Sequence, residues 1–366
     1  MRVGIVTKWF NRGQAYVARQ MRSAFADLGH ESYVLARPSR ARGPQPAFID
    51  RSPDWVQPGV TEASSWTVPA GEYARWVDEN RLEIVFFDNC FQFAEVAALR
   101  RAGVRTAGRF IWEFFAREHV APTRDAFDVV YSLTRAEQRR YAELGIESPL
   151  LRWGIHPELL DIEADRDPEL VRLYFPGGLM GPRKPRREVL EAFVRTPGPE
   201  LRLLIKAQVD RHPRFLEKAA ASDPRVEVIV DDLPTDEHRR LFAGCDVCLA
   251  PSRWEGLGVF LYEAIACGMP IITNDDPPMN EVVEHELNGL LVASEPDGEA
   301  PSGVEARKPD VESLAAAIER IRDPATRSAL ERGAHQVRER LSWDGTVTSL
   351  AHLLDRLGAG DGPTRG

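Results

Sequence analysis

Short runs of β-branched and aromatic residues alternate with segments of helical periodicity along most of this 366-residue chain. The first run, RVGIVT at residues 2–7, precedes apolar residues at helical spacing over 15–29, and a second run follows at 32–37. A strand, a helix and a second strand in this order open a doubly wound α/β sheet. The same half is expected to continue with strands at residues 82–88, 104–111 and 127–133.

A second alternation begins near residue 170. Its strands are expected at residues 171–177, 201–207, 226–232, 246–252, 269–275 and 287–293. The stretch WGIHP, residues 153–157, breaks the pattern between the two series. The sequence therefore predicts an α/β protein with two Rossmann-like domains, residues 1–160 and 161–340, facing a central cleft. Residues 341–366 are expected to form an amphipathic helix followed by a flexible tail.

The charge distribution excludes one class of partner. The net charge is −9; residues 1–152 carry 21 Lys and Arg against 18 Asp and Glu, and residues 153–366 carry 26 against 38. Nucleic acid requires a basic footprint, so it is not expected as a partner. The mildly basic first part favours an anionic acceptor or a membrane surface, with ordinary solvated charge as the alternative.

Neither a membrane span nor a metal site is expected. No eighteen consecutive residues are apolar, and the N-terminal MRVGIVTKWF becomes polar too soon for a signal peptide. We therefore expect a cytoplasmic protein, with peripheral membrane contact left open. The four cysteines suit reduced thiols in an apolar core, and the CxxC spacing of Cys245 and Cys248 lacks the second pair that zinc needs.

Two nucleotide-binding motifs are absent. Residues 11–16 read NRGQAY, with one glycine where a dinucleotide fingerprint has three, and no GxxxxGK[ST] occurs. The stretch SRWEGLGVFLYEA, residues 252–264, is more informative. Gly256 and Gly258 separate a strand from a helix, so that backbone N–H groups and the helix N-terminus offer a seat for phosphate.

Two carboxylates accompany this phosphate seat. Glu255 precedes it, and Glu263 follows eight residues later, which on a continuous helix places both on roughly one face. A nucleotide-sugar, with hydroxyls at both ends and phosphates between them, would satisfy this layout. Solvated loop surface is the alternative for Glu255, and backbone amides or an arginine are alternative partners for Glu263.

Arg183 and Lys184 lie between a glycine turn and a helix. An arginine fork beside a lysine point charge suits a diphosphate, especially as charge develops on a leaving group. The alternative is a solvated start of the helix.

The run PSRWEGLGVFLYEAIACGMPIITNDDPPMNEVVEHELNGLLV, residues 251–292, resembles the donor site of the retaining glycosyltransferases of family 4 (group 1), which have the GT-B fold. The resemblance also covers the stretch just upstream, the opening strand–glycine loop–helix, and SWDGTVTSLAHLL, which is similar to the family's last helix crossing back to the first domain. It implies an N-terminal acceptor-side domain and a C-terminal nucleotide-sugar domain.

The resemblance implies roles for individual residues. Glu255 would contact the transferred sugar, Glu263 the ribose hydroxyls, and Arg183 with Lys184 the leaving diphosphate. The implied donor-binding residues are Gly13, Ser252, Gly256, Leu257, Gly258, Val259 and Glu263. The donor would be a UDP-sugar by default, with GDP next, acting as a co-substrate and with no other cofactor.

The chain also departs from the family pattern. Gly177-Gly178-Leu179 stands where Gly-Arg-Leu is common, and Pro277-Pro278 replaces a glycine-rich turn. Where the family often has a histidine, this chain has Trp112 and Glu113, and either Glu113 replaces it or it is a structural acid. The residues expected on the sugar or acceptor side are Asn11, Trp112, Glu113 and Glu281.

The expected reaction is hexosyl transfer to an acceptor hydroxyl with retention and without a metal. A glycoside hydrolase does not fit, because its two carboxylates flank one bond, whereas here they would lie at opposite ends of a nucleotide. A sugar-nucleotide epimerase or phosphorylase of the same fold and a catalytically silent binding protein remain as alternatives. The acceptor is expected to be sugar-containing or a small molecule, and the sequence does not identify it.

Overall fold

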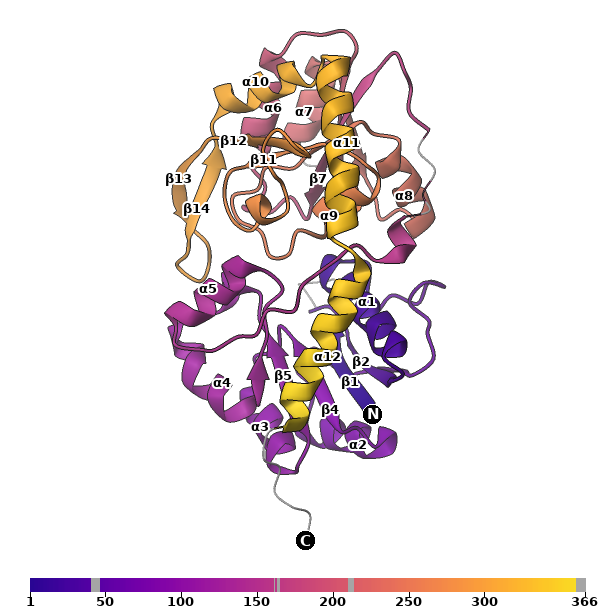
Figure 1. Ribbon diagram of the computed structural model, residues 1–366, viewed down its shortest axis with the longest axis vertical. Helices are drawn as coiled ribbons and strands as arrows, with labels where there is room; N and C mark the ends of the chain where they lie inside the picture. Colours follow the sequence, from indigo (N-terminus) through magenta and orange to yellow (C-terminus); the bar gives the residue numbers. More distant parts are fainter. Residues whose placement is uncertain (41–46, 161, 163–164, 210–213, 360–366) are drawn as a thin grey trace. The chain divides into compact units, whose positions relative to one another are not determined.

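The computed structural model describes residues 1–40, 47–160, 162, 165–209 and 214–359. The chain forms two compact units, shown with their elements labelled in Figure 1. The first comprises Met1–Trp153 and the segment that begins at Asp344, and the second is Gly154–Trp343. The predicted flexible tail lies largely in residues 360–366, which are outside the described residues.

The first unit is built on a six-stranded parallel sheet in the order β3-β2-β1-β4-β5-β6. Its strands are β1 (Arg2–Lys8), β2 (Glu31–Arg37), β3 (Val60–Glu62), β4 (Ile84–Asp88), β5 (Arg105–Arg109) and β6 (Val129–Val130). Its helices are α1 (Gly13–Asp27), α2 (Ala70–Asn80), α3 (Phe93–Arg101), α4 (Val120–Ala126), α5 (Arg135–Glu143) and α12 (Trp343–Ala359), with short 3₁₀ turns η1 (Trp112–Phe114) and η2 (Arg117–His119). This strand order is that of a Rossmann domain.

The second unit repeats the plan with the order β12-β11-β10-β7-β8-β9. Its strands are β7 (Val171–Gly178), β8 (Leu201–Ala207), β9 (Val226–Val230), β10 (Val247–Leu249), β11 (Ile271–Asn274) and β12 (Gly289–Val292). Its helices are α6 (Arg186–Arg195), α7 (Arg214–Ser222), α8 (Thr235–Ala243), α9 (Val259–Ala266), α10 (Val311–Arg320) and α11 (Pro324–Arg340), with η3 (Pro157–Leu159) and η4 (Met279–Glu281). The prediction of two doubly wound sheets is therefore confirmed.

Burial explains why the strands are such uniform apolar runs. Both faces of a parallel sheet are covered by helices, so a central strand has no solvent side; in β1 the five residues from Val3 to Thr7 are all buried. Each unit has its own apolar core, one including Val6, Phe87 and Phe110 and the other including Leu173, Phe175 and Ile205.

Helix ends follow local chemistry. The Asp310 side chain accepts a hydrogen bond from the Ser313 N–H at 2.7 Å at the start of α10. Asp323 does the same for Thr326 at 2.9 Å at the start of α11, whose first residue is Pro324. Satisfying these otherwise unpaired N–H groups fixes where the two helices begin.

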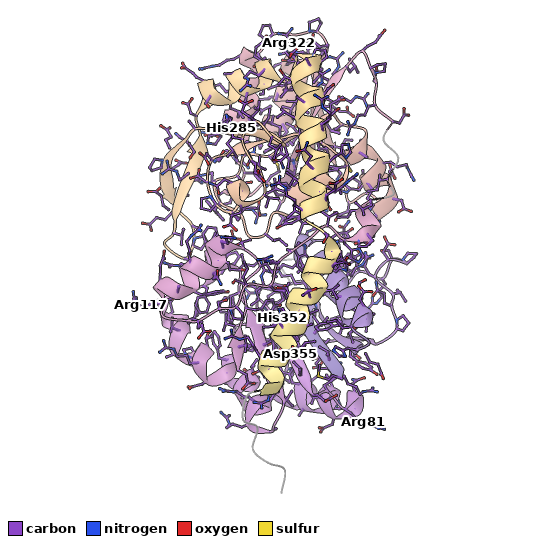
Figure 2. All side chains as sticks on the ribbon, in the orientation of Figure 1. Arg81, Arg117, His285, Arg322, His352 and Asp355 are labelled. Atoms are coloured by element: carbon purple, nitrogen blue, oxygen red, sulfur yellow. The ribbon has the colours of Figure 1, made fainter. Side chains whose placement is uncertain are left out.

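Helix α12 is amphipathic, as its sequence predicts. Figure 2 labels His352 and Asp355, both exposed on this helix. The side chains that it buries are Leu350, Leu353, Leu354 and Leu357. The Ser349 hydroxyl donates to the Leu150 carbonyl at 3.2 Å and accepts from the Arg152 N–H at 3.1 Å, which joins the helix to the end of the first unit's long segment.

Three features differ from the sequence prediction or were absent from it, and one is the short strand β3, which was not expected. Glu255 does not lie on the helix that carries Glu263, because α9 begins at Val259 after a left-handed residue, Gly258, with φ of 71°. The eight-residue spacing therefore does not place the two carboxylates on one helical face. In addition, β13 (Ser294–Glu299) and β14 (Glu305–Pro309) form an antiparallel hairpin beside the second sheet (Figure 1).

Candidate active site

The site lies at the carboxyl edge of the second sheet, where the strand order reverses. Strands β7 and β10 are neighbours, and the chain leaves them toward opposite sides of the sheet. Such a switch point leaves a crevice beyond the two strand ends, which is where ligands bind in open α/β sheets. The loop after β7 carries Arg183 and Lys184, and the loop after β10 carries Ser252 and Glu255.

Glu255 is the centre of this arrangement. Its Oε1 lies 3.1 Å from Arg183 Nη1, and its Oε2 lies 3.3 Å from Lys184 Nζ. Lys184 also donates to Ser252 Oγ at 3.0 Å, and the Gly256 N–H donates to Glu255 Oε1 at 3.1 Å. Lys184 and Glu255 are nearly inaccessible, whereas the Arg183 side chain is 38% exposed. The sequence predicted these residues as a site but not their mutual contacts.

The electrostatics of this cluster favour an anion. Two cations share one carboxylate, so the charges of Arg183, Lys184 and Glu255 sum to +1. Burial opposes ionisation of Glu255, but the two cations and the Gly256 N–H hold its pKa below the ordinary value. Burial lowers the pKa of Lys184, and the adjacent Arg183 lowers it further. An incoming negative group would relieve the repulsion between the cations.

The helix that follows completes the phosphate seat. Gly258 caps α9 in the left-handed region, and a Cβ there would meet Leu261 Cδ1 at 2.9 Å. Leu257 is buried and Val259 is half-buried at the first helical position. Free N–H groups at such a helix start carry partial positive charge. This end of α9 and the Arg183–Glu255–Lys184 cluster are therefore joined by Gly256 to Gly258.

Glu263 lies one turn into α9 and is half-buried. The pKa of its carboxyl group is raised to about 7, mainly by burial, with Arg239 opposing the rise and Glu158 adding to it. Within the described residues its carboxylate accepts no hydrogen bond from the protein, although Arg239 forms an ion pair with Glu158 at 3.1 Å. The sequence left backbone amides or an arginine open as hydrogen-bond donors to Glu263. Neither kind of donor reaches its carboxylate in the described part of the chain.

Sequence reasoning missed a second arginine. The Arg253 guanidinium pairs with Asp297 of the β13–β14 hairpin at 2.7 Å and donates to the Pro182 carbonyl at 3.0 Å. Its backbone N–H donates to the Arg183 carbonyl at 2.9 Å, and its own carbonyl accepts from the Arg307 N–H at 3.0 Å. The hairpin thereby holds the two loops of the site together. The sequence shows this arginine inside the SRWEG motif, but a single arginine there does not indicate that it links two loops.

The other predicted residues belong to other elements of the chain. Asn11 is half-buried in the loop before α1, Gly13 is the exposed first residue of that helix, and Trp112 and Glu113 are buried in η1; all four belong to the first unit. Glu281 ends η4 in the second unit, and burial together with the Glu281 charge raises the pKa of Tyr262. Among the described residues, no group of three His, Cys, Asp or Glu is placed to hold a metal ion.

Comparison with known proteins fits this geometry. Residues 178–335, which contain both loops and α9, match the family model described as "Glycosyl transferases group 1". This region is similar to group 1 glycosyltransferases. Among curated proteins, D-inositol 3-phosphate glycosyltransferase of Acidothermus cellulolyticus is 29% identical to this chain over 123 residues, which cover 34% of the chain and 24% of that protein. The first three curated relatives are each matched over only 16–27% of their length.

Solved structures resemble the chain over nearly its whole length. Sucrose-phosphate synthase from Thermosynechococcus elongatus superposes with a TM-score of 0.73 at 17% identity, over 99% of this chain and 100% of that one. Anabaena Alr3699/HepE, in complex with UDP and glucose, gives 0.70 at 14% identity over 97% and 99%. At this identity the likeness shows the fold, and the fold is GT-B. No helix in the described part of the chain is long and apolar enough to cross a membrane.

Proposed function

We propose that the protein transfers a hexose from a nucleoside diphosphate sugar to an acceptor hydroxyl with retention at the anomeric carbon. The observation that carries this proposal is the Arg183–Glu255–Lys184 cluster, with its net charge of +1, at the switch point beside the start of α9. A diphosphate matches that seat in charge and position. The Anabaena structures with UDP and with UDP-glucose support UDP as the nucleotide.

In the proposed donor complex, different charged and polar groups bind different parts of the donor. Arg183 and Lys184 bind the diphosphate, and backbone N–H groups from Gly256 to Val259 bind its distal phosphate and the sugar. As Arg183 and Lys184 turn toward the phosphates, Glu255 is released to accept hydrogen bonds from sugar hydroxyls. Glu263, whose carboxylate has no protein donor in the described chain, accepts from the ribose hydroxyls.

The proposed chemistry needs no protein base and no metal. The bond between the anomeric carbon and the diphosphate oxygen breaks, and the acceptor oxygen attacks the same face of that carbon. The acceptor proton passes to the departing diphosphate oxygen. Arg183, Lys184 and the start of α9 stabilise the charge that develops on the leaving group, which is where preorganised positive groups lower a barrier most.

The proposal is tested first by nucleotide binding. Thermal shifts are measured with UDP, GDP, dTDP, ADP and CMP on the wild type, on Glu263→Ala and on Glu339→Ala, whose exposed carboxylate lies far along the chain on α11. A ligand at about 100 times its Kd adds about 2.7 kcal/mol of stability. We expect one diphosphate to raise the Tm, and the shift to be lost only in Glu263→Ala. No shift from any nucleotide would overturn the donor assignment.

Turnover separates transfer from the alternatives. Release of free nucleotide from the donor sugar is followed in the wild type and in Glu255→Gln and Lys184→Ala, both of which we expect to be strongly impaired. Full activity in both variants would contradict the proposal. Isomerised donor without an acceptor would instead indicate an epimerase, and tight binding with no turnover across acceptors would indicate a binding protein. An inverted product would refute retention alone.

A further inference from the structure

An aromatic ring contacts the Lys184 ammonium in the second unit. Lys184 Nζ lies 4.4 Å from the centre of the Phe260 ring. An ammonium has three N–H donors. Within the described part of the chain its oxygen acceptors are Ser252 Oγ at 3.0 Å and Glu255 Oε2 at 3.3 Å. The face of the Phe260 ring is therefore the third group that surrounds this charge.

The start of α9 brings the ring to this place. Gly258 precedes the helix in the left-handed region, with φ of 71°, and its carbonyl accepts from the Leu261 N–H at 2.8 Å. Phe260 is thus the second residue of α9 and is half-buried. The loop after β7 supplies Lys184, so the contact joins the two loops of the candidate site through a side chain that carries no charge.

Burial makes the charge of Lys184 costly. The Lys184 side chain is 4% exposed, and an ammonium removed from water loses free energy unless neighbouring groups replace its hydration. Burial lowers the pKa of Lys184; Glu255 and the Cys248 thiol of β10 oppose this shift, and Arg183 adds to it. The site therefore needs further stabilisation of the charged form.

A ring stabilises a cation without cancelling its charge. The face of an aromatic ring attracts an ammonium, more strongly when water is excluded, yet the ring is neutral. The charges of Arg183, Lys184 and Glu255 sum to +1, and a second carboxylate in place of the ring would reduce that sum to zero. Phe260 thus leaves the positive charge available to an anion.

We propose that Phe260 is a positioning residue for the diphosphate: its ring holds the charged Lys184 ammonium at the phosphate seat. In the proposed donor complex Lys184 turns from Glu255 toward the phosphates, and a ring does not compete with phosphate oxygens as a hydrogen-bond acceptor. The role toward a diphosphate rests on the proposed function, whereas the contact between ring and ammonium does not.

The first experiment changes the electrons of the ring and keeps its shape. Phe260 is replaced by phenylalanines that carry one, two or three fluorine atoms, and by leucine in Phe260→Leu. Fluorine withdraws electron density from the ring face and so weakens its attraction for a cation. Calorimetry measures the Kd of UDP, and thermal melting measures the Tm. We expect the Kd to rise with each fluorine, reaching about tenfold in Phe260→Leu, while the Tm of the fluorinated variants stays close to that of the wild type.

Phe193 offers a matched control for fluorination. Its buried ring lies 4.7 Å from Arg225 Cζ, and Arg225 pairs with Asp223 at 2.7 Å, outside the candidate site. The same fluorinated series at Phe193 weakens a cation–π contact that has no proposed part in donor binding. We expect it to leave the Kd of UDP unchanged.

The second experiment follows Lys184 itself, without a nucleotide. The chain has five lysines, so the carbon beside each ammonium can be followed by NMR after labelling, and Lys184→Arg identifies the Lys184 signal. Because the ring favours the charged form, Phe260→Leu and the trifluorinated ring at Phe260 should move the pKa of Lys184 further below its ordinary value. The trifluorinated ring at Phe193 should not move it.

The two experiments separate this proposal from the donor assignment. A UDP affinity that does not change along the Phe260 series, or that changes equally along the Phe193 series, would overturn the role of Phe260 and leave donor use intact. A Lys184 titration that ignores the substitutions at Phe260 would also overturn it. If Lys184 responds to Phe260 but the wild type binds no nucleotide, the contact stands and its role toward a diphosphate is refuted.

Discussion

Replacing Glu263 by glutamine should change how stability depends on pH. A pKa raised from 4.5 to about 7 corresponds to about 3 kcal/mol between the two protonation states, at about 1.4 kcal/mol for each pH unit. Because Glu263 is only half-buried, water screens part of this cost, and we expect about 1–2 kcal/mol. Between about pH 4.5 and 7 the folded protein holds a proton that the unfolded chain has released. The free energy of unfolding therefore falls as the pH rises through this window.

Glu263→Gln removes this cost because glutamine does not ionise. At pH 5 the variant and the wild type should unfold at nearly the same urea concentration. At pH 8 the variant should be more stable by about 1–2 kcal/mol. Urea unfolding at both pH values measures this, with Glu339→Gln as the exposed control. A wild-type–variant difference that is the same at pH 5 and pH 8 would refute the reasoning, because it would show that Glu263 ionises as it does in the unfolded chain.

Three further perturbations follow from the same contacts. Glu255→Gln leaves two neighbouring cations without their shared carboxylate, so we expect a loss of about 3 kcal/mol in urea unfolding; an unchanged midpoint would contradict the cluster. Asp297→Asn breaks the partly exposed ion pair with Arg253 and should lower the free energy of unfolding by under about 1 kcal/mol. It should nevertheless slow donor turnover, because the loops of the candidate site lose a contact with the hairpin. A kcat equal to that of the wild type would show that the hairpin does not position these loops. Gly333→Ala would place a Cβ 1.8 Å from the Leu287 carbonyl and should lower the Tm by several degrees, since backbone must move.

The fold was predictable because its signal is local. Buried parallel strands must be apolar and helices must show a 3.6-residue period, so the alternation of strands and helices along the chain follows from patterning. The short edge strand β3 was missed because its sequence VTE is largely polar and exposed. The hairpin of β13 and β14 escaped prediction because SEPDGE and EARKP are polar and rich in residues that strands disfavour. Ion pairs such as Arg307 with Asp276 at 3.0 Å link it to the rest of the second unit.

The sequence marked residues of the candidate site but not the contacts among them. Glycines at strand–helix junctions mark Arg183, Lys184 and Glu255 because backbone must approach a ligand there. Nothing in a separation of more than 70 residues indicates that Glu255 bridges both cations. The helical phase of Glu255 was wrong because the left-handed Gly258 starts α9 only at Val259. Periodicity cannot reveal where a helix begins when the preceding loop is also apolar.

The first unit is made of two pieces of chain, and this affects how the protein is made. The Arg152 N–H and the Ser349 hydroxyl, which bond to each other, are 197 residues apart in sequence. During synthesis the N-terminal sheet emerges first, but α12 leaves the ribosome only after the whole continuous second unit. Until α12 has been made, the apolar surface that its buried leucines cover stays exposed. A chain that stops near residue 343 would contain every residue of the candidate site, yet release a first unit that lacks α12.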